Sequence, residues 1–162
     1  MRLIDLLGED VIIPDLTASD ATGAIGDLLQ GLVSSGRLPA EDLERVRSIV
    51  LEREASMSTG IGHGVAIPHG TVPGLDGVLG ALGRSVDGID FKAIDGQPVN
   101  LVVLVLVGEN AYRQHIRTLA IVSRLLNSQA LREHLLCAGG AAEMLRLIRA
   151  EESGELRDHR AL

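Results

Sequence analysis

Residues 101–107 read Leu-Val-Val-Leu-Val-Leu-Val, an unbroken apolar run rich in β-branched side chains. A run that is apolar on both faces predicts a strand buried on both faces, rather than one with a solvent-exposed side. The run is far shorter than the roughly 18 residues that suggest a membrane-spanning helix. It is therefore expected to be an inner strand of a sheet that other elements cover.

Helical patterns flank this strand along the chain. Apolar spacing of three and four residues predicts a helix with Thr17 or Ser19 as its N-cap, a second from Pro39, and a strong helix after residue 110. Further helical segments are predicted at 131–136 and 141–148, and short strands at 11–13, 78–82 and 89–91. This alternation predicts an α/β fold with helices covering a sheet. In the helix after residue 110, the residues expected along one side are Ile116, Leu119, Ala120, Ser123 and Leu126 or Asn127.

Length and composition exclude several classes of protein. The chain has 162 residues, the size of one domain, and residues 151–162 are expected to form a polar, frayed tail. The chain has 15 Lys and Arg residues against 22 Asp and Glu residues. It lacks the cluster of basic and aromatic residues that would indicate a nucleic-acid interface. The acidic start of the chain is not expected to act as a signal peptide. A protein without membrane insertion, located in the cytoplasm, is expected.

Residues 58–70 read Ser-Thr-Gly-Ile-Gly-His-Gly-Val-Ala-Ile-Pro-His-Gly and carry the chemistry. The glycines permit tight turns and close approach of another group, but they match neither the Walker loop nor Gly-x-Gly-x-x-Gly. His69 stands between Pro68 and Gly70, so its ring has little cover from its neighbours. It is either a candidate functional histidine or an ordinary turn residue.

His115 is a second candidate, because it stands in the first turn of the helix that follows the buried strand. It is spaced with Leu119 and Val122 at the edge of an apolar stripe, which directs its ring toward the fold. Sites in α/β proteins form where strands end and helices begin, and a helix N-terminus favours anions. A neutral His115 could donate a hydrogen bond to a phosphoryl oxygen there, or simply bind a backbone carbonyl.

These motifs resemble the EIIA domain of the phosphoenolpyruvate-dependent sugar phosphotransferase system, of the fructose/mannitol type that includes nitrogen-regulatory EIIA. The resemblance covers residues 1–150 and is carried by Arg53-Glu54, residues 58–62, residues 65–70 and residues 95–99, which read Asp-Gly-Gln-Pro-Val. It implies a three-layer α/β/α sandwich around a mixed sheet. The family pattern differs at Thr71, where many members carry Lys, and at His63, where some carry Asn.

The resemblance implies that His69 accepts a phosphoryl group from an HPr-like phosphocarrier and passes it to an EIIB domain. The chain would then be a phosphotransferase component with a phosphohistidine intermediate, a phosphocarrier more than a turnover enzyme. His115 and Arg53 would stabilise the phosphoryl group, without a metal ion or an organic cofactor. The residues expected to contact the phosphoryl group are Thr59, Gly60, Gly62 and Gly70.

Plainer interpretations stay open for several of these residues. Arg53 suits the end of a helix as a cation, Thr59 could simply stabilise its turn, and Glu54 is expected to be solvated. His63 is expected in a surface turn, although His63, His69 and His115 together could instead hold a metal ion. Met57 and Cys137 are expected to pack in the interior.

Two functions share these motifs. One is sugar uptake, in which an EIIB domain receives the phosphoryl group. The alternative is a stand-alone nitrogen-type regulatory EIIA, whose phosphorylation state on His69 controls partner proteins. The sequence does not name the sugar, the downstream partner or the oligomeric state.

Overall fold

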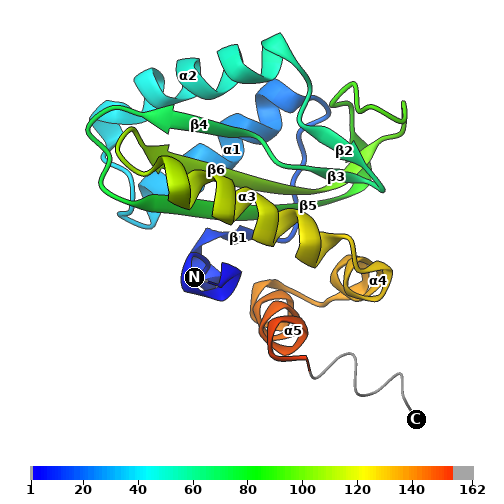
Figure 1. Cartoon of the computed structure of the whole chain (residues 1–162). Coiled ribbons are helices and arrows are strands. Elements are labelled where there is room, and N and C mark those ends of the chain that lie inside the picture. Colours follow the sequence, from blue (N-terminus) through cyan, green and yellow to red (C-terminus); the bar gives the residue numbers. More distant parts are fainter. Residues whose placement is uncertain (1, 155–162) are drawn as a thin grey trace.

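The computed structural model describes residues 2–154 as one mixed sheet between two layers of helices (Figure 1). Three short 3-10 helices, Leu3–Asp5, Glu9–Val11 and Ala40–Asp42, precede longer elements. The strands are β1 (Ile12–Ile13), β2 (Gly60–Gly62), β3 (Val65–Ala66), β4 (His69–Val72), β5 (Val78–Ile89) and β6 (Val99–Gly108). The helices are α1 (Ala21–Ser34), α2 (Leu43–Ser56), α3 (Tyr112–Leu126), α4 (Gln129–Cys137) and α5 (Ala141–Ser153).

Strand β6 lies inside the sheet, as residues 101–107 predicted. It pairs antiparallel with β5 on one side, and on the other it pairs in parallel with β3 and then with β4. The remaining pairs are β1 with β5, parallel, and β2 with β3, antiparallel. Residues 101–107 are all buried, so the prediction of a strand covered on both faces is confirmed.

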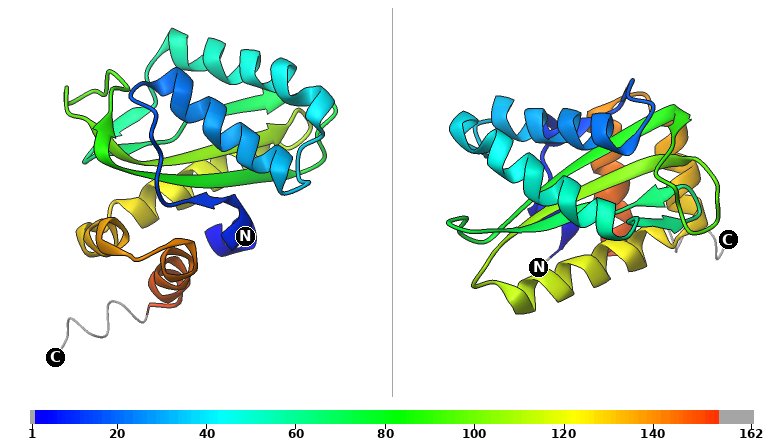
Figure 2. Two further views of the ribbon diagram at one scale, coloured as in Figure 1. Left: turned by 180° about the vertical axis from the view of Figure 1, so that it is seen from behind. Right: turned by 90° about the horizontal axis from the view of Figure 1, so that it is seen from above.

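The helices form two layers, which confirms the predicted three-layer sandwich. Helices α1 and α2 cover one face of the sheet, and α3, α4 and α5 cover the other (Figure 2). The core is aliphatic apart from Phe91, because the other aromatic residue, Tyr112, is 72% exposed. Both layers therefore hold the sheet through Leu, Val, Ile and Ala contacts.

Several local predictions differ from the structure. The N-cap of α1 is Asp20, whose carboxylate accepts the Gly23 N–H at 2.8 Å, and neither Thr17 nor Ser19 takes that role. Residues 78–82 and Ile89, which were predicted in two strands, belong to one long strand, β5, with a register shift between Arg84 and Ile89. Residues 90–91 of the second predicted strand lie beyond its end.

The predicted stripe of α3 is only partly confirmed: Leu126 is buried and Leu119 packs against the core, but the rest of the stripe does not face the core. Its buried residues are Thr118, Val122 and Leu126, one turn apart, whereas Ile116 is 54% exposed. A helix of 3.6 residues per turn cannot bury Ile116 and Ala120 on the side that carries positions 118, 122 and 126. Met57 and Cys137 are also exposed, so the prediction that they pack in the interior is wrong.

Polar contacts join the layer of α3, α4 and α5 to the sheet and to the start of the chain. Arg84, only 5% exposed, donates to the carbonyls of Leu135 and Ala138 at the end of α4, and to Pro14. Glu152 accepts the N–H groups of Leu3 and Ile4 at 2.7 and 2.8 Å. Glu152 was expected in a frayed tail, but α5 continues to Ser153; the rest of the predicted tail, 155–162, lies outside the described residues.

Candidate active site

His69 is the first residue of β4, where it pairs with Val105 of the buried strand β6. Its Nδ1 lies 2.8 Å from the Ile67 carbonyl oxygen. Because a carbonyl oxygen only accepts, Nδ1 carries the proton of the neutral ring and Nε2 keeps its lone pair. The local fold therefore selects one tautomer and leaves one nucleophilic nitrogen.

The structure brings His115 against His69, which is consistent with the shared site that the family resemblance implied for them. The two ring centroids are 5.3 Å apart, and the ring planes meet edge to face at 85°. His69 comes from the sheet and His115 from the first turn of α3. Both side chains are half-buried, so each ring keeps part of its surface accessible to solvent.

The site favours the neutral form of both rings. Burial is the main cause that lowers the pKa of His69, and the Arg53 charge lowers it further. The hydrogen bond to Ile67 and the Glu54 carboxylate oppose that shift. The pKa of His115 is lowered by burial first, then by His69 and Arg53. Two neutral imidazoles are therefore present at pH 7, one of which can act as a nucleophile and the other as a hydrogen-bond donor.

Arg53 and Glu54 stand together in the last turn of α2, and each holds a different part of the loop that follows. Arg53 Nη1 donates to the Met57 carbonyl at 3.0 Å. Glu54 accepts the Thr59 N–H at 3.0 Å and the Thr59 hydroxyl at 2.6 Å. The expectation that Glu54 is solvated is therefore wrong. A signal for its role was in the sequence, because an acidic residue is electrostatically unfavourable at a helix C-terminus unless a local partner compensates.

Thr59 is 5% exposed and its hydroxyl hydrogen is engaged by Glu54. This contact supports the interpretation that Thr59 stabilises its turn; contact of Thr59 with a phosphoryl group stays a prediction. The same holds for the three glycines, each of which has a steric role. A Cβ on Gly60 would lie 2.7 Å from Ala93 Cβ, one on Gly70 would lie 3.0 Å from Ile49, and Gly62 has φ +95°.

His63 lies apart from the two paired histidines. It occupies the β2–β3 turn with φ +58°, between two glycines that also have positive φ, and lines a small pocket with residues of α4. Within residues 2–154, no three His, Cys, Asp or Glu side chains gather as a group that could hold a metal ion. The alternative of a three-histidine metal site therefore has no support from the geometry.

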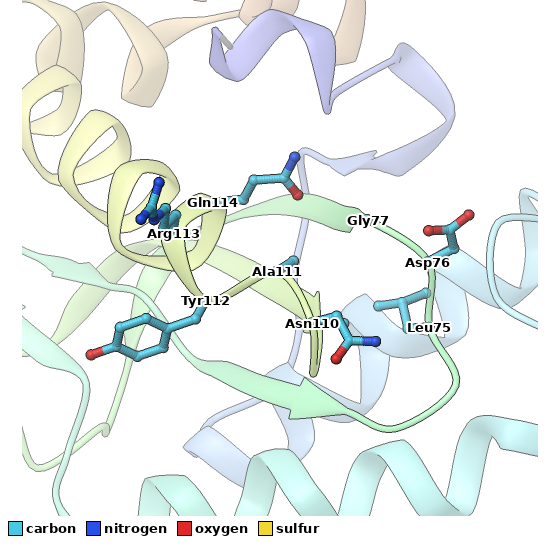
Figure 3. Close-up of a pocket in the computed structure, with 9 residues that line it drawn as sticks. Leu75, Asp76, Gly77, Asn110, Ala111, Tyr112, Arg113 and Gln114 are labelled. Carbon is cyan, nitrogen blue, oxygen red and sulfur yellow. The ribbon is translucent and has the colours of Figure 1, made fainter.

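A cleft of about 610 Å³ adjoins the site at the start of α3 (Figure 3). It lies between the β4–β5 connection, at Leu75 and Asp76, and the helix start at Asn110 and Ala111. Tyr112 projects from the same helix turn (Figure 3). The nine lining residues include neither His69 nor His115, so this cleft does not contain the histidine pair.

Residues 5–151 match the family described as phosphoenolpyruvate-dependent sugar phosphotransferase system, EIIA 2. The chain belongs to this EIIA family. A nitrogen regulatory protein of Bradyrhizobium diazoefficiens is 36% identical over 135 residues, 83% of this chain and 86% of that protein. The fructose-specific EIIABC component of Bacillus subtilis is 33% identical over 136 residues, 84% of this chain but only 21% of that protein.

A solved EIIA-type structure supports the same family on the level of the fold. The crystal structure of nitrogen regulatory protein IIA-Ntr from Neisseria meningitidis superposes with a TM-score of 0.80 at 29% identity. The superposition covers 90% of this chain and 98% of that one. No helix in the described part of the chain is long and apolar enough to cross a membrane.

Proposed function

We propose that this EIIA protein is a phosphocarrier that accepts a phosphoryl group on His69 Nε2 and passes it to an EIIB domain in sugar uptake. The donor is an HPr-like phosphocarrier, and the reaction takes place in the cytoplasm. One observation carries the assignment to His69. Its Nδ1–H is tied to the Ile67 carbonyl, so Nε2 is the ring nitrogen with a lone pair available.

The transfer requires no bond-making group beyond this nitrogen. The Nε2 lone pair attacks the phosphorus as the bond from phosphorus to the donor breaks, and that electron pair returns to the donor. Phosphoryl transfer depends mainly on positioning and on stabilisation of charge. A pKa held below its ordinary value keeps His69 neutral at pH 7 and hence nucleophilic.

The bound phosphoryl group brings close to two negative charges to the site. Arg53 is near enough to both rings to lower the pKa of each, so the same positive charge can stabilise a phosphoryl group there. His115, neutral and 5.3 Å from His69 between ring centroids, can donate an N–H to a phosphoryl oxygen. These two residues are therefore assigned to charge stabilisation and not to acceptance.

The surface near the site suits a protein partner. Several large apolar side chains are exposed on segments that carry or adjoin the site: Met57, Ile61, Ile94, Tyr112 and Ile116. Exposed apolar patches mark protein interfaces, and we propose that these side chains contribute to one. The Bacillus subtilis relative is named an EIIABC component, which supports an EIIB domain as the acceptor here.

The test is phosphorylation of the purified protein by labelled phosphoenolpyruvate with Enzyme I and HPr. We expect an acid-labile label in the wild type, none in His69→Ala, and full labelling in His134→Ala, whose ring lies exposed on α4. Label that persists in His69→Ala would overturn the assignment of the acceptor.

A second function, a regulatory EIIA of the nitrogen type, is favoured by the nitrogen regulatory relative, whose match spans most of both chains. The chemistry on His69 would be the same, and the phosphorylation state would control a partner protein. Transfer from the labelled protein to purified EIIB domains separates the two functions. Rapid loss of label to an EIIB domain supports sugar uptake, whereas label retained in the presence of every EIIB domain of the host supports regulation.

A further inference from the structure

Both carboxylate oxygens of Glu54 accept a hydrogen bond from the same buried residue, Thr59. Oε1 accepts the Thr59 N–H at 3.0 Å, and Oε2 accepts the Thr59 hydroxyl at 2.6 Å. Thr59 is only 5% exposed and stands immediately before β2. A carboxylate that accepts two hydrogen bonds fixes both the position and the rotation of the residue it holds.

Two further hydrogen bonds connect Thr59 to the nucleophile, His69. The Ile67 N–H donates to the Thr59 carbonyl at 3.1 Å, which joins the two ends of the β2–β3 segment. The Ile67 carbonyl in turn accepts the His69 Nδ1–H at 2.8 Å. Glu54, Thr59, Ile67 and His69 therefore form one chain of contacts from the end of α2 to the imidazole.

We propose that Glu54 is a positioning residue, which fixes through Thr59 and Ile67 the carbonyl that selects the Nδ1–H tautomer of His69. The proposal rests on His69 as the phosphoryl acceptor. Loss of the two Glu54–Thr59 hydrogen bonds frees Thr59 and shifts Ile67. The His69 ring can then rotate or change tautomer. Either change removes the Nε2 lone pair from the direction of attack, although Glu54 itself touches neither the ring nor the phosphoryl group.

The neighbouring side chains hold other parts of the loop and do not replace Glu54. Arg53 binds the Met57 carbonyl, and the Ser58 hydroxyl binds the Phe91 carbonyl. Neither contact reaches Ile67. Arg53 thus anchors the loop before Thr59, and Ser58, whose hydroxyl oxygen also accepts the Gly60 N–H at 3.1 Å, holds the residues beside it. Glu54 holds the residue that carries the connection to His69.

The charge of Glu54 adds a second, separable effect. The charged groups that face His69 are Arg53 and Glu54 from α2, and His115 is the titratable group from α3. The Glu54 carboxylate raises the pKa of His69, against the lowering by burial and by Arg53. A variant that keeps the hydrogen bonds but removes the charge should therefore change the pKa of His69 and leave its tautomer in place.

Two substitutions at position 54 separate these effects. In Glu54→Gln, the amide oxygen can accept the Thr59 N–H and the amide nitrogen can donate to the Thr59 hydroxyl. Both hydrogen bonds are therefore kept without the charge. Glu54→Ala removes both contacts, and Thr59→Val removes the hydroxyl contact from the other side. The matched control is Glu52→Ala, two positions away in the same helix and exposed.

The measurements are the ¹⁵N chemical shifts of His69 in the unphosphorylated protein and the rate of phosphoryl transfer from HPr. We expect Glu54→Ala to lose the pure Nδ1–H tautomer and to transfer about 10- to 100-fold more slowly, since small misplacements of a reacting group cost rates of this order. Thr59→Val should show a smaller change of the same kind. Glu54→Gln should keep the tautomer, transfer within about threefold of wild type, and show a lower pKa of His69.

The result that overturns the proposal is a folded Glu54→Ala or Thr59→Val protein with the wild-type tautomer and a rate equal to that of Glu52→Ala. If Glu54→Ala does not fold, Thr59→Val decides alone, because valine fits the volume of threonine. The tautomer is read without any phosphorylation. A wild-type protein that HPr does not label therefore refutes the proposed function, while the ¹⁵N shifts still test the role of Glu54.

Discussion

The two histidines of the site are held in different ways. His69 follows a loop in which Arg53 donates a hydrogen bond and Glu54 accepts one, and the ring of His69 itself donates to a carbonyl. His115 is held by its place in the first turn of α3, and its ring meets the edge or face of the His69 ring. One histidine is fixed at the ring, whereas the other is fixed at the backbone.

This difference matches the two tasks that we assign. A nucleophile needs a defined tautomer and a defined direction of attack, which the bonded ring of His69 provides. A residue that stabilises charge on a group that arrives and leaves needs only to be within reach. On this assignment, we expect the loop to orient the nucleophile and the helix start to stabilise charge during transfer.

Among variants that keep His69, the largest expected effect on transfer rate comes from removing His115. His115→Ala should still accept a phosphoryl group on His69, but it should transfer on the order of a hundredfold more slowly, as loss of one preorganised donor does elsewhere. The check is a rapid-quench measurement of transfer from HPr and to an EIIB domain. Gln114→Ala, exposed on the same turn, is the control. Wild-type rates in His115→Ala would refute its role.

A smaller effect should follow from overpacking the loop side. A Cβ at position 60 would lie 2.8 Å from the Ala93 backbone, so Gly60→Ala must push the start of β2 away from Ala93. We expect a loss of about 1–3 kcal/mol in the free energy of unfolding and about tenfold slower transfer. Urea unfolding and the transfer assay measure both quantities.

Gly26→Ala provides the matched control, since nothing lies within 4 Å of a Cβ at that helical position. It should be neutral or slightly stabilising, because alanine is the better helix residue. Equal stability of Gly60→Ala and Gly26→Ala would show that the loop yields at this contact.

The smallest effect is expected on the pH dependence of phosphoryl acceptance at acid pH. There the pKa values of the two histidines can be compared directly. Arg53 lowers the pKa of both rings, so Arg53→Gln should raise both toward the ordinary value near 6.5. The acid midpoint of phosphoryl acceptance should therefore move to higher pH. NMR titration of each ring checks the shift, with Arg47→Gln as the control. Unchanged pKa values in Arg53→Gln would contradict the electrostatic role.

The sign of the stability effect follows from the same shifts. Each histidine has a lower pKa in the folded protein than in the unfolded chain, so the unfolded chain binds these protons first as the pH falls. Acidification below the unfolded pKa should lower the free energy of unfolding of the wild type. The decrease should be smaller in Arg53→Gln.

The inner strand and the place of His115 at a helix start could be predicted because local patterns carry them, whereas the pairing of His115 with His69 came from the family resemblance. The apolar run 101–107 can be buried on both faces only inside a sheet, and His115 opens the helix that follows it. The extent of β5 could not be predicted in the same way. Residues 83–88 contain two glycines and alternate irregularly, and pairing with β6 and the burial of Arg84 keep them in the sheet.

The role of Glu54 and the orientation of α3 depend on contacts that spacing does not encode. The Glu54–Thr59 contact crosses a helix end, where neither helical nor strand periodicity applies. In α3 the core accepts Thr118 in place of the more apolar Ile116. The prediction that Ile116 faces the core rested on its apolarity alone. Packing against the sheet instead buries the side of the helix that carries Thr118, Val122 and Leu126.

The contact of Glu152 with Leu3 and Ile4 ties the two ends of the described chain to each other. The family match stops at residue 151, one residue before this contact. A fragment trimmed to that boundary would leave two backbone N–H groups at the start of the chain without their acceptor. Adjacent ends also permit a circular permutant, in which a short linker joins residues 2 and 154 and new termini open in an exposed loop far from His69.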